Sequence, residues 1–315
     1  MQALVTGGAG FIGSHLVREL CARGARVRVL DDLSSGTLDN LVWRSPGDAI
    51  DFIQGDIRDA ALVSKAVAGC DWVFHEAAIA SVPATIDRPV ESNVINLEAT
   101  LGILTAAREA RVRRLVFASS AAVYGDGPEP VKHESLPVLP LSPYALQKYA
   151  GERYAQFFHR FYGLPTVSLR YFNVFGPRQA FNSAYSGVIA RFCTAMLRGE
   201  APVLFGDGLQ SRDFIAIDNV VHANLLAAEA PESAAAGRVF NCATGHAISL
   251  LDLVAEINHQ TGQNLAPVHQ PARAGDIRHS CADVSAIREA LGFQVRTSWR
   301  EGLAATLAFY RGGMA

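Results

Sequence analysis

Apolar residues in the first half of the chain alternate between short β-branched runs and longer stretches with helical spacing. The runs predict strands, and the stretches between most of them predict helices. The predicted strands span residues 3–6, 26–30, 51–54, 72–75 and 115–118, and the first predicted helix spans 12–23. Strands that alternate with helices form parallel sheets, and ligands bind at the carboxyl ends of those strands. The pattern therefore predicts an α/β fold with a doubly wound parallel sheet.

The pattern changes after residue 125. Five prolines between residues 125 and 143 interrupt every periodicity and predict a long loop, which leads into a helix over 144–161. Residues beyond 170 are irregular and rich in glycine and aromatic side chains, which suggests a smaller substrate-facing domain. Residues 212–228 again predict a strand and a helix, so the two domains are expected to interleave. We expect a first domain of residues 1–170 plus about 214–240, and a second of about 171–213 and 241–315.

Composition narrows the class of protein. Of the 315 residues, 50% are hydrophobic and 18% are charged, which is enough apolar material for a sizeable core. Lys and Arg total 28 against 30 Asp and Glu, and this balance argues against a nucleic-acid partner. No apolar stretch approaches the roughly 18 residues of a membrane span. The nine histidines show no convincing metal-ligand spacing, so no metal site is expected.

The start of the chain and its cysteines indicate the same compartment. The first predicted strand begins at once, within the first five residues, so we expect no secretory signal peptide. The five cysteines form no CxxC pair or tight cluster, which is typical of free thiols in a reducing compartment. We therefore expect a cytoplasmic protein without a membrane partner.

A glycine-rich turn of sequence TGGAGFIG occupies residues 6–13, between the first predicted strand and the first helix. Glycines let the backbone approach a pyrophosphate, and the helix N-terminus offers free N–H groups to the anion. Asp31 ends the second strand, 18 residues after Gly13, where it can bind the adenosine ribose and favour NAD over NADP. Asp32 can share this role. The sequence therefore predicts a Rossmann-like domain that binds NAD.

Asp56 and Ile57 follow the third predicted strand and are expected at the adenine edge of the cofactor. The alternative interpretation is that Asp56 is an ordinary helix N-cap.

A Tyr144-x-x-x-Lys148 pair lies on the helix predicted over 144–161. Residues four apart share one helix face, so the phenol and the ammonium point together. A tyrosine has a pKa of about 10, and lowering it about three units takes about 4 kcal/mol, which Lys148 and the nicotinium ring of NAD can supply. Ser120 comes just after the strand predicted over 115–118, where its hydroxyl can steady a substrate alcohol, or else cap a helix. No G-x-S-x-G elbow occurs and no cysteine has a base neighbour, so hydrolase and metalloenzyme chemistry are rejected.

This ordered set of motifs, completed by Arg170-Tyr-Phe-Asn173, resembles the extended short-chain dehydrogenase/reductase family and, within it, the UDP-hexose 4-epimerases. The resemblance runs nearly end to end. It implies an isomerase that works through a redox-neutral cycle on tightly held NAD. Tyr144 would take the proton from the sugar O4 while Ser120 bridges, and a hydride would leave C4. The 4-keto sugar would then turn over and receive the hydride on its other face.

The resemblance also implies two sets of binding residues. The cofactor set is Gly7, Gly10, Phe11, Ile12, Gly13, Asp31, Asp32, Ser35, Gly36, Asp56, Ile57, Ala77, Ala78, Asn93, Tyr144, Lys148 and Tyr171. The substrate set is Ser81, Ser120, Asn173, Gln179, Gly187, Val188, Phe205, Arg212, Arg273, Asp276 and Ser280. Phe205 would contact the uracil, Arg212 the diphosphate, and Arg273 and Asp276 a phosphate and the ribose. Each of the charged residues can instead be an ordinary surface ion-pair partner.

Two small residues bear on the choice of sugar. Ser280 stands where family members confined to plain glucose and galactose carry a tyrosine, and Ala80 stands where such members often carry lysine. Both resemble members that accept N-acetylated sugars, and the stretches 173–179 and 184–187 point the same way. A small residue permits a large substrate without requiring it, because lost contacts cost only about 1–3 kcal/mol of discrimination.

The residues after Ser120 bear on the other activities of this family. Dehydratase relatives place an acidic pair after the catalytic hydroxyl residue, and Ala121 and Ala122 stand here instead. UDP-glucuronate epimerases, decarboxylases and other family members that act on nucleotide sugars remain open. A non-catalytic NAD-binding sensor is the competing class, and such proteins typically lose the Tyr, Lys or Ser that this chain keeps.

The helix over 144–161 carries aromatic residues on more than one face, namely Tyr149, Tyr154, Phe157, Phe158 and Phe161. A helix with this pattern is buried on two sides. The family resemblance implies a homodimer formed through a four-helix bundle.

Overall fold

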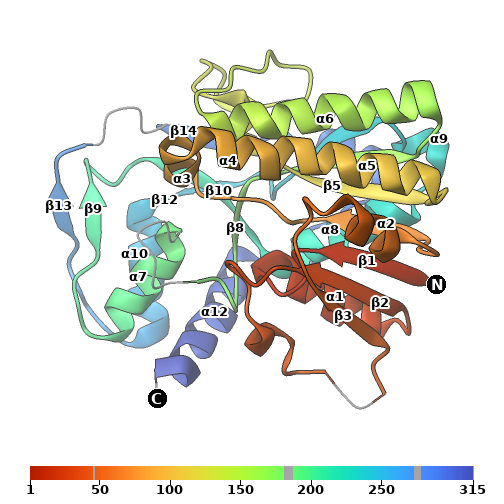
Figure 1. Cartoon of the computed structure of the whole chain (residues 1–315). Coiled ribbons are helices and arrows are strands. Elements are labelled where there is room, and N and C mark those ends of the chain that lie inside the picture. Colours follow the sequence, from red (N-terminus) through yellow and green to blue (C-terminus); the bar gives the residue numbers. More distant parts are fainter. Residues whose placement is uncertain (45–46, 181–186, 273–277, 315) are drawn as a thin grey trace.

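A computed structural model describes residues 1–44, 47–180, 187–272 and 278–314 of the chain. A parallel sheet of seven strands forms one side of the molecule, and a smaller five-stranded sheet lies beside it (Figure 1). The large sheet has the order β11-β7-β5-β4-β1-β2-β3. Its strands are β1 (Gln2–Thr6), β2 (Arg26–Asp31), β3 (Ile50–Gln54), β4 (Trp72–His75), β5 (Arg114–Ser120), β7 (Thr166–Tyr171) and β11 (Arg238–Cys242).

Strand order reverses between β1 and β4, because β2 and β3 lie on one side of β1 while β4, β5 and β7 continue on the other. This is the topological switch point at which doubly wound sheets bind ligands. The predicted doubly wound sheet is thus confirmed, and each of its five predicted strands agrees with the structure to within two residues at either end.

Helices cover both faces of the large sheet. One face carries α1 (Phe11–Ala22), α8 (Ile217–Glu229), α9 (Glu232–Ala235) and α11 (Ser285–Leu291). The other carries α2 (Ala60–Val67), α3 (Val82–Asp87), α4 (Pro89–Asn93), a π-helical turn (Val94–Glu98), α5 (Ala99–Glu109) and α6 (Pro143–Tyr162). Short 3-10 turns occupy Leu38–Leu41 and Ala121–Tyr124. Separate apolar clusters fill the two faces, one around Leu16 and Val220 and the other around Ile103 and Phe117.

The smaller sheet is built from β6 (Val131–Lys132), β8 (Asn173–Phe175), β10 (Ser211–Ala216), β12 (Ala247–Ser249) and β14 (His279–Ala282). A third apolar cluster joins it to nearby helices. Those helices are α7 (Val188–Leu197), α10 (Leu250–Thr261) and α12 (Trp299–Met314), and a two-stranded sheet of β9 (Val203–Phe205) and β13 (Val268–Gln270) lies at the end of this part (Figure 1).

Two details differ from the sequence predictions. The loop expected over 125–143 contains β6, because Val131 and Lys132 pair in parallel with Cys281 and Ala282 of β14. Residues 214–216, expected with the first domain, pair instead with β8 in the smaller sheet. Both pairings join segments far apart in the sequence. The predicted division into two domains itself stays a prediction.

Helix α6 has clear start and stop signals in its sequence. The Ser142 side chain accepts a hydrogen bond from the N–H of Ala145, and Pro143 occupies the first turn, where a missing N–H costs nothing. Gly163 ends the helix in the left-handed conformation with φ of 70°. In Figure 1, α6 runs beside α5 along one side of the large sheet.

A buried ion pair fixes α6 to the sheet. The guanidinium of Arg170 on β7 donates from Nε and Nη2 to the two carboxylate oxygens of Glu152, both at 2.8 Å. Ser119 on β5 donates to the same carboxylate at 2.5 Å. The side chains of Glu152 and Arg170 are only 1% and 4% exposed, so neither charge has water as an alternative partner.

We predict that Glu152→Gln lowers the free energy of unfolding by about 3 kcal/mol, because it leaves the Arg170 charge buried and uncompensated. Urea denaturation measures the change. The matched control is Glu229→Gln, which removes an exposed partner of Arg23 and should change stability by less than about 1 kcal/mol. Equal effects of the two substitutions would contradict the structural role given to the buried pair.

Candidate active site

The carboxyl ends of the central strands bring most of the predicted residues to one edge of the large sheet. β1 leads into the glycine turn, β2 ends at Asp31, and β5 ends at Ser120. Helix α6 lies against β5 and carries Tyr144 and Lys148. Residues predicted for cofactor and for catalysis therefore lie along one continuous edge.

The glycine turn has the geometry of a phosphate cradle. Gly7 has φ of +68°, and a Cβ atom there would lie 2.9 Å from the Cα of Ala77. A Cβ atom at Gly13 would overlap the carbonyl of Gly7. No side chain caps the N-terminus of α1, so its first N–H groups are free to bind an anion. The turn therefore fits the pyrophosphate of NAD. The predicted Phe11 and Ile12 form the first turn of this helix.

Asp31 is buried at the end of β2 and holds the glycine turn in place. Its carboxylate accepts hydrogen bonds of 2.9 Å from the N–H groups of Ala9 and Leu33. Burial raises its pKa, and these two hydrogen bonds oppose the shift. Each carboxylate oxygen keeps a second lone pair for a ribose hydroxyl. Gly36 also packs here, because a Cβ atom would lie 2.8 Å from the carbonyl carbon of Ala9.

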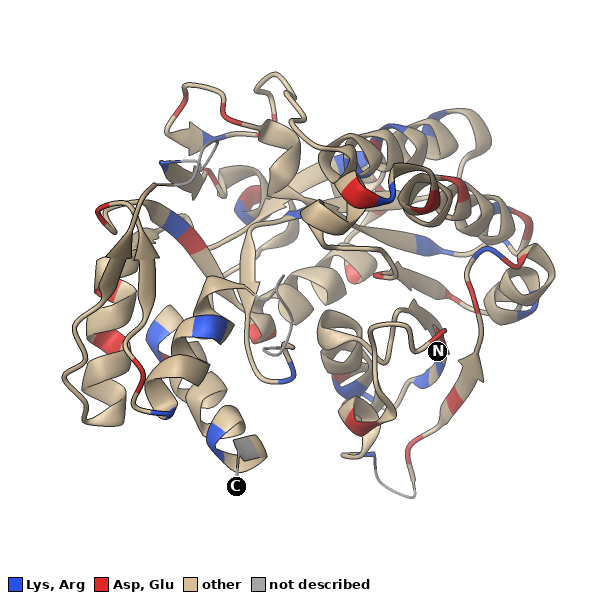
Figure 2. Ribbon diagram, turned by 60° about the vertical axis from the view of Figure 1, so that its left-hand side comes forward, with Lys and Arg blue, Asp and Glu red and all other residues tan. Residues whose placement is uncertain are grey.

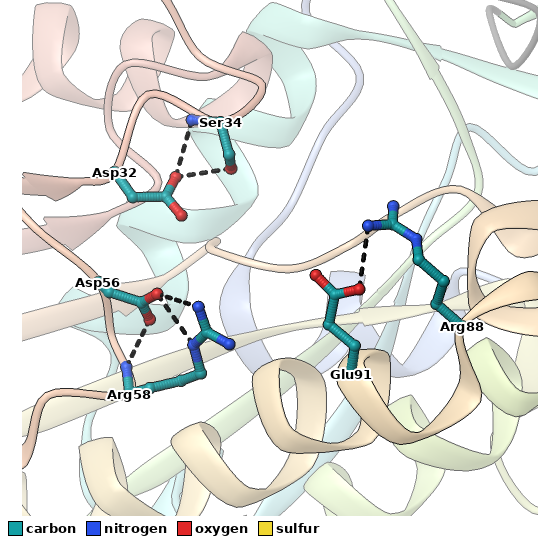
Figure 3. Close-up of polar contacts among 6 residues, drawn as sticks. All are labelled: Asp32, Ser34, Asp56, Arg58, Arg88 and Glu91. Atoms are coloured by element: carbon teal, nitrogen blue, oxygen red, sulfur yellow. Dashed lines mark hydrogen bonds and ion pairs between the residues drawn. The ribbon is translucent and has the colours of Figure 1, made fainter.

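Polar and charged contacts lie just beyond the ends of β2 and β3 and on the nearby α4 (Figure 3). Asp32 accepts hydrogen bonds from the N–H and the hydroxyl of Ser34. The Asp56 carboxylate accepts three hydrogen bonds from Arg58. The main-chain N–H of Arg58 donates at 2.8 Å, and its guanidinium donates at 2.9 and 2.5 Å. The alternative interpretation of Asp56 as a helix cap is wrong, because Asp59 caps α2. Figure 3 shows Glu91, paired with Arg88, across from Arg58.

The structure brings Ser120, at the end of β5, together with Tyr144 and Lys148 of α6. The Ser120 hydroxyl hydrogen-bonds the Tyr144 phenol, and it also accepts from the N–H of Ala122 at 3.2 Å. Ser120 is therefore both a cap of a 3-10 turn and a partner of the phenol. Lys148 Nζ donates to the carbonyl of Ala118 at 2.7 Å and lies 5.9 Å from the centre of the Tyr144 ring.

The surroundings of Tyr144 disfavour its phenolate form. Burial raises the pKa of Tyr144, although its hydrogen bond with Ser120 acts in the opposite direction. Burial lowers the pKa of Lys148 to about 8, while the carboxylates of Glu76 and Glu152 act to raise it. A phenolate in this site therefore needs additional positive charge, which an oxidised nicotinamide ring beside it would supply.

Most of the predicted substrate residues lie around the smaller sheet. Asn173 donates to the carbonyl of Asp213 at 3.0 Å, and Gln179 donates to that of Val174 at 3.2 Å. A Cβ atom at Gly187, the N-cap of α7, would lie 3.3 Å from Gln179 Nε2. Val188 begins α7 and Phe205 ends β9. Arg212 and Ser280 are register neighbours on β10 and β14. Arg273 and Asp276 lie outside the described residues.

The remaining predicted residues occupy the ends of β2, β3, β4 and β7 and the helices beside them. Ser81 caps α3 by accepting from the N–H of Ala84 at 3.2 Å, and Asn93 donates to Glu98 at 3.3 Å. Ser35, Ile57, Ala77 and Ala78 lie on the loops that follow their strands. The phenol of Tyr171 donates to Glu76 at 2.8 Å.

Sequence reasoning missed two polar residues of this region. Asn96, in the π-helical turn, accepts from the N–H of Ile79 and donates to its carbonyl and to Gln147 on α6. Glu76 follows β4 and binds Tyr171. Asn96 lies three residues after the predicted Asn93. The π turn that begins after Asn93 adds a residue to the helix and changes which asparagine faces inward, and no local sequence pattern reveals such a turn.

Positive and negative residues are interspersed over the ribbon (Figure 2). Within the described ranges, no helix is both long and apolar enough to cross a membrane, and no three His, Cys, Asp or Glu residues are arranged to hold a metal ion.

A doubly wound sheet with a phosphate cradle at its switch point and a Ser, Tyr and Lys group farther along the same edge is typical of an NAD-binding enzyme. A model of the NAD dependent epimerase/dehydratase family matches residues 3–243, and the chain belongs to this family. The predicted family, fold class and NAD cofactor are thus confirmed.

Individual relatives carry more specific names. The chain is 40% identical over 313 residues to a UDP-glucose 4-epimerase of Mycolicibacterium smegmatis, with 99% of each chain covered. It is also 40% identical to a solved UDP-N-acetylglucosamine 4-epimerase of Methanobrevibacter ruminantium in complex with UDP-N-acetylmuramic acid, with a TM-score of 0.94 and 99% of each chain covered. A UDP-glucose 4-epimerase of Thermus thermophilus in complex with NAD is 36% identical, with a TM-score of 0.87 and 99% of each chain covered. These relatives are UDP-sugar 4-epimerases, which are isomerases.

We predict that Gly13→Ala weakens NAD binding by about tenfold or more, because relieving the overlap with Gly7 must shift the cradle at a cost of about 1–3 kcal/mol. Calorimetric titration with NAD measures the affinity. Gly102→Ala, on α5 with open space around it, is the control and should leave the affinity unchanged. Unaltered binding by the Gly13 variant would rule out the cradle as the pyrophosphate site.

Proposed function

We propose that this protein catalyses the 4-epimerisation of a UDP-hexose on bound NAD, through a transient 4-keto sugar. The observation that carries the proposal is the grouping of Ser120, Tyr144 and Lys148 beside the phosphate cradle. The similarity to UDP-sugar 4-epimerases over the whole chain supports it.

Each of the three residues has a distinct task in this proposal. Tyr144 removes the proton from the sugar O4 and later returns it, so that no net proton is consumed. Ser120 hydrogen-bonds both the phenol and the substrate hydroxyl and keeps the proton path short. Lys148 supplies positive charge that stabilises the phenolate. NAD, when bound, would supply the acceptor and donor for the hydride of the sugar C4.

The residues that would bind NAD lie along the same edge of the sheet. The glycine turn and the N-terminus of α1 would bind the pyrophosphate, and Asp31 would accept hydrogen bonds from the adenosine ribose. Asp31 would also repel the 2′-phosphate of NADP. Lys148 would bind the nicotinamide ribose on the catalytic side.

The sugar nucleotide is proposed to lie between this edge and the smaller sheet. Arg212 on β10 offers a guanidinium for the diphosphate, and Phe205 on β9 a ring for the uracil. Ser280, the register neighbour of Arg212, leaves room beside the sugar. We therefore propose that the enzyme accepts UDP-GlcNAc and UDP-GalNAc as well as UDP-Glc and UDP-Gal.

The domain division belongs to this proposal. Residues 1–170 and about 214–240 would bind NAD, and about 171–213 and 241–315 would bind the nucleotide sugar. We also propose that the enzyme works in the cytoplasm, because all five cysteines are free thiols.

We predict that Tyr144→Phe abolishes turnover, by a factor of at least about 10² to 10⁴, because the general base is removed. NAD binding should survive, because the ring still fills its place. The turnover of UDP-glucose and the NAD content of the same preparation are measured together. Activity that survives the substitution would contradict the proposed mechanism.

A homodimer is proposed through the outer face of α6. Tyr154 and Phe157 are each 38% exposed and Phe161 is 64% exposed, although they form one contiguous row of rings. Helix α5 packs beside α6, so two such pairs would complete a four-helix bundle. A second copy of the chain packed over this row would remove its aromatic surface from water.

We predict that the wild-type protein is a dimer by light scattering and that Phe161→Glu shifts it to a monomer, because the added charge cannot be buried in an apolar interface. Phe309→Glu is the control, since Phe309 is also exposed but lies on α12. A monomeric wild-type protein would exclude the proposed bundle.

A further inference from the structure

Glu76 is an ionisable residue to which the mechanism above gives no task. It directly follows β4, and β4 lies between β1 and β5 in the large sheet. β1 leads into the glycine turn, and β5 ends at Ser120. A cofactor that extends along the sheet edge from the glycine turn to Ser120 has to pass the end of β4. Glu76 therefore lies at the nicotinamide half of the expected cofactor site.

Hydrogen bonds fix the direction of this side chain. The Tyr171 phenol donates to Glu76 Oε1 at 2.8 Å. The amide of Asn224 donates to the Tyr171 oxygen at 2.7 Å and to the carbonyl of Val220 at 2.9 Å. The phenol proton has two acceptors within reach, Glu76 Oε1 at 2.8 Å and Asn224 Oδ1 at 3.1 Å, and the contact with Glu76 is the shorter of the two. Among the described residues, the second carboxyl oxygen of Glu76 has no hydrogen-bond partner, and the side chain is half-buried.

Charged and titratable groups face Glu76 from three elements. Tyr144 and Lys148 reach it from α6, Tyr171 from β7, and Cys242 from β11. Burial raises the pKa of Glu76 to about 7, and the hydrogen bond from Tyr171 and the positive charge of Lys148 oppose this shift. A carboxyl group in this setting is readily ionised by one more positive charge beside it.

We propose that Glu76 is a further cofactor-binding residue: held by Tyr171, its carboxylate favours the positively charged oxidised nicotinamide ring over the neutral reduced one. The two cofactor forms differ by one unit of charge at the ring, so a carboxylate nearby binds them unequally. In a partly solvated site, one carboxylate near the ring changes the ratio of the NAD⁺ and NADH affinities by about tenfold. The proposed redox-neutral cycle must start from oxidised cofactor, and Glu76 would keep the resting enzyme in that state.

The test compares the two cofactor forms without any sugar. Purified protein is equilibrated with mixtures of NAD⁺ and NADH at about pH 8, above the pKa of about 7 given for Glu76. Free cofactor is then removed, and the bound reduced fraction is read from the near-ultraviolet absorbance of reduced nicotinamide. We expect Glu76→Gln, which keeps the size of the side chain, to shift the partition about tenfold toward NADH.

Two further variants separate charge from structure. Glu76→Asp keeps the charge, and Glu289→Gln removes a carboxylate that is exposed on α11. Both should stay within about twofold of the wild-type partition. An unchanged partition in Glu76→Gln, or an equal shift in Glu76→Asp or Glu289→Gln, would overturn the proposal. Because no sugar is present, failure here is distinct from failure of the epimerase proposal.

Discussion

The buried pair of Glu152 and Arg170 determines where the catalytic helix lies. Burying one charge alone would be prohibitive, and the two-pronged contact at 2.8 Å satisfies the pair only when α6 is docked in one position against β7. Ser119 adds a third contact from β5. Burial disfavours the charged form of Arg170, but its hydrogen bonds with Glu152 outweigh this effect and raise the pKa of the guanidinium above its ordinary value. A buried pair of this kind contributes orientation more than net stability.

Two adjacent serines at the end of β5 contact different residues of α6. Ser119 points toward α6 and binds Glu152, and Ser120, the next residue, takes part in the catalytic group. Eight residues separate Tyr144 from Glu152 along α6, so both lie near one helix face. Fixing Glu152 consequently fixes the height and rotation of Tyr144 and Lys148 above the sheet. The polar contacts that hold the helix and those that would act on the sugar thus come from neighbouring positions of the same elements.

Sequence reasoning succeeds here where chemistry is local. The glycine turn, Asp31 and the Tyr144 to Lys148 spacing each depend on residues close in sequence, and their places follow from strand and helix periodicity. It fails where contacts are long-range. The pairing of β6 with β14 joins segments about 150 residues apart, and no pattern within a two-residue strand reveals it. Glu76 was missed because a single acid after a strand has no distinctive pattern until Tyr171, 95 residues away, is seen to bind it.

We propose above all that the chain interconverts the C4 epimers of UDP-sugars on its own NAD. The most direct test of this claim is to incubate the purified protein with UDP-GlcNAc, UDP-glucose and UDP-glucuronate separately, with NAD supplied only where no reaction occurs, and to follow the anomeric protons by NMR. We expect the C4 epimers of UDP-GlcNAc and UDP-glucose to form. Reaction of UDP-glucose alone would refute the inference from Ser280 and leave the mechanism intact. Reaction of UDP-glucuronate alone would reassign the substrate, and no reaction with any of the three, even with added NAD, would contradict the claim.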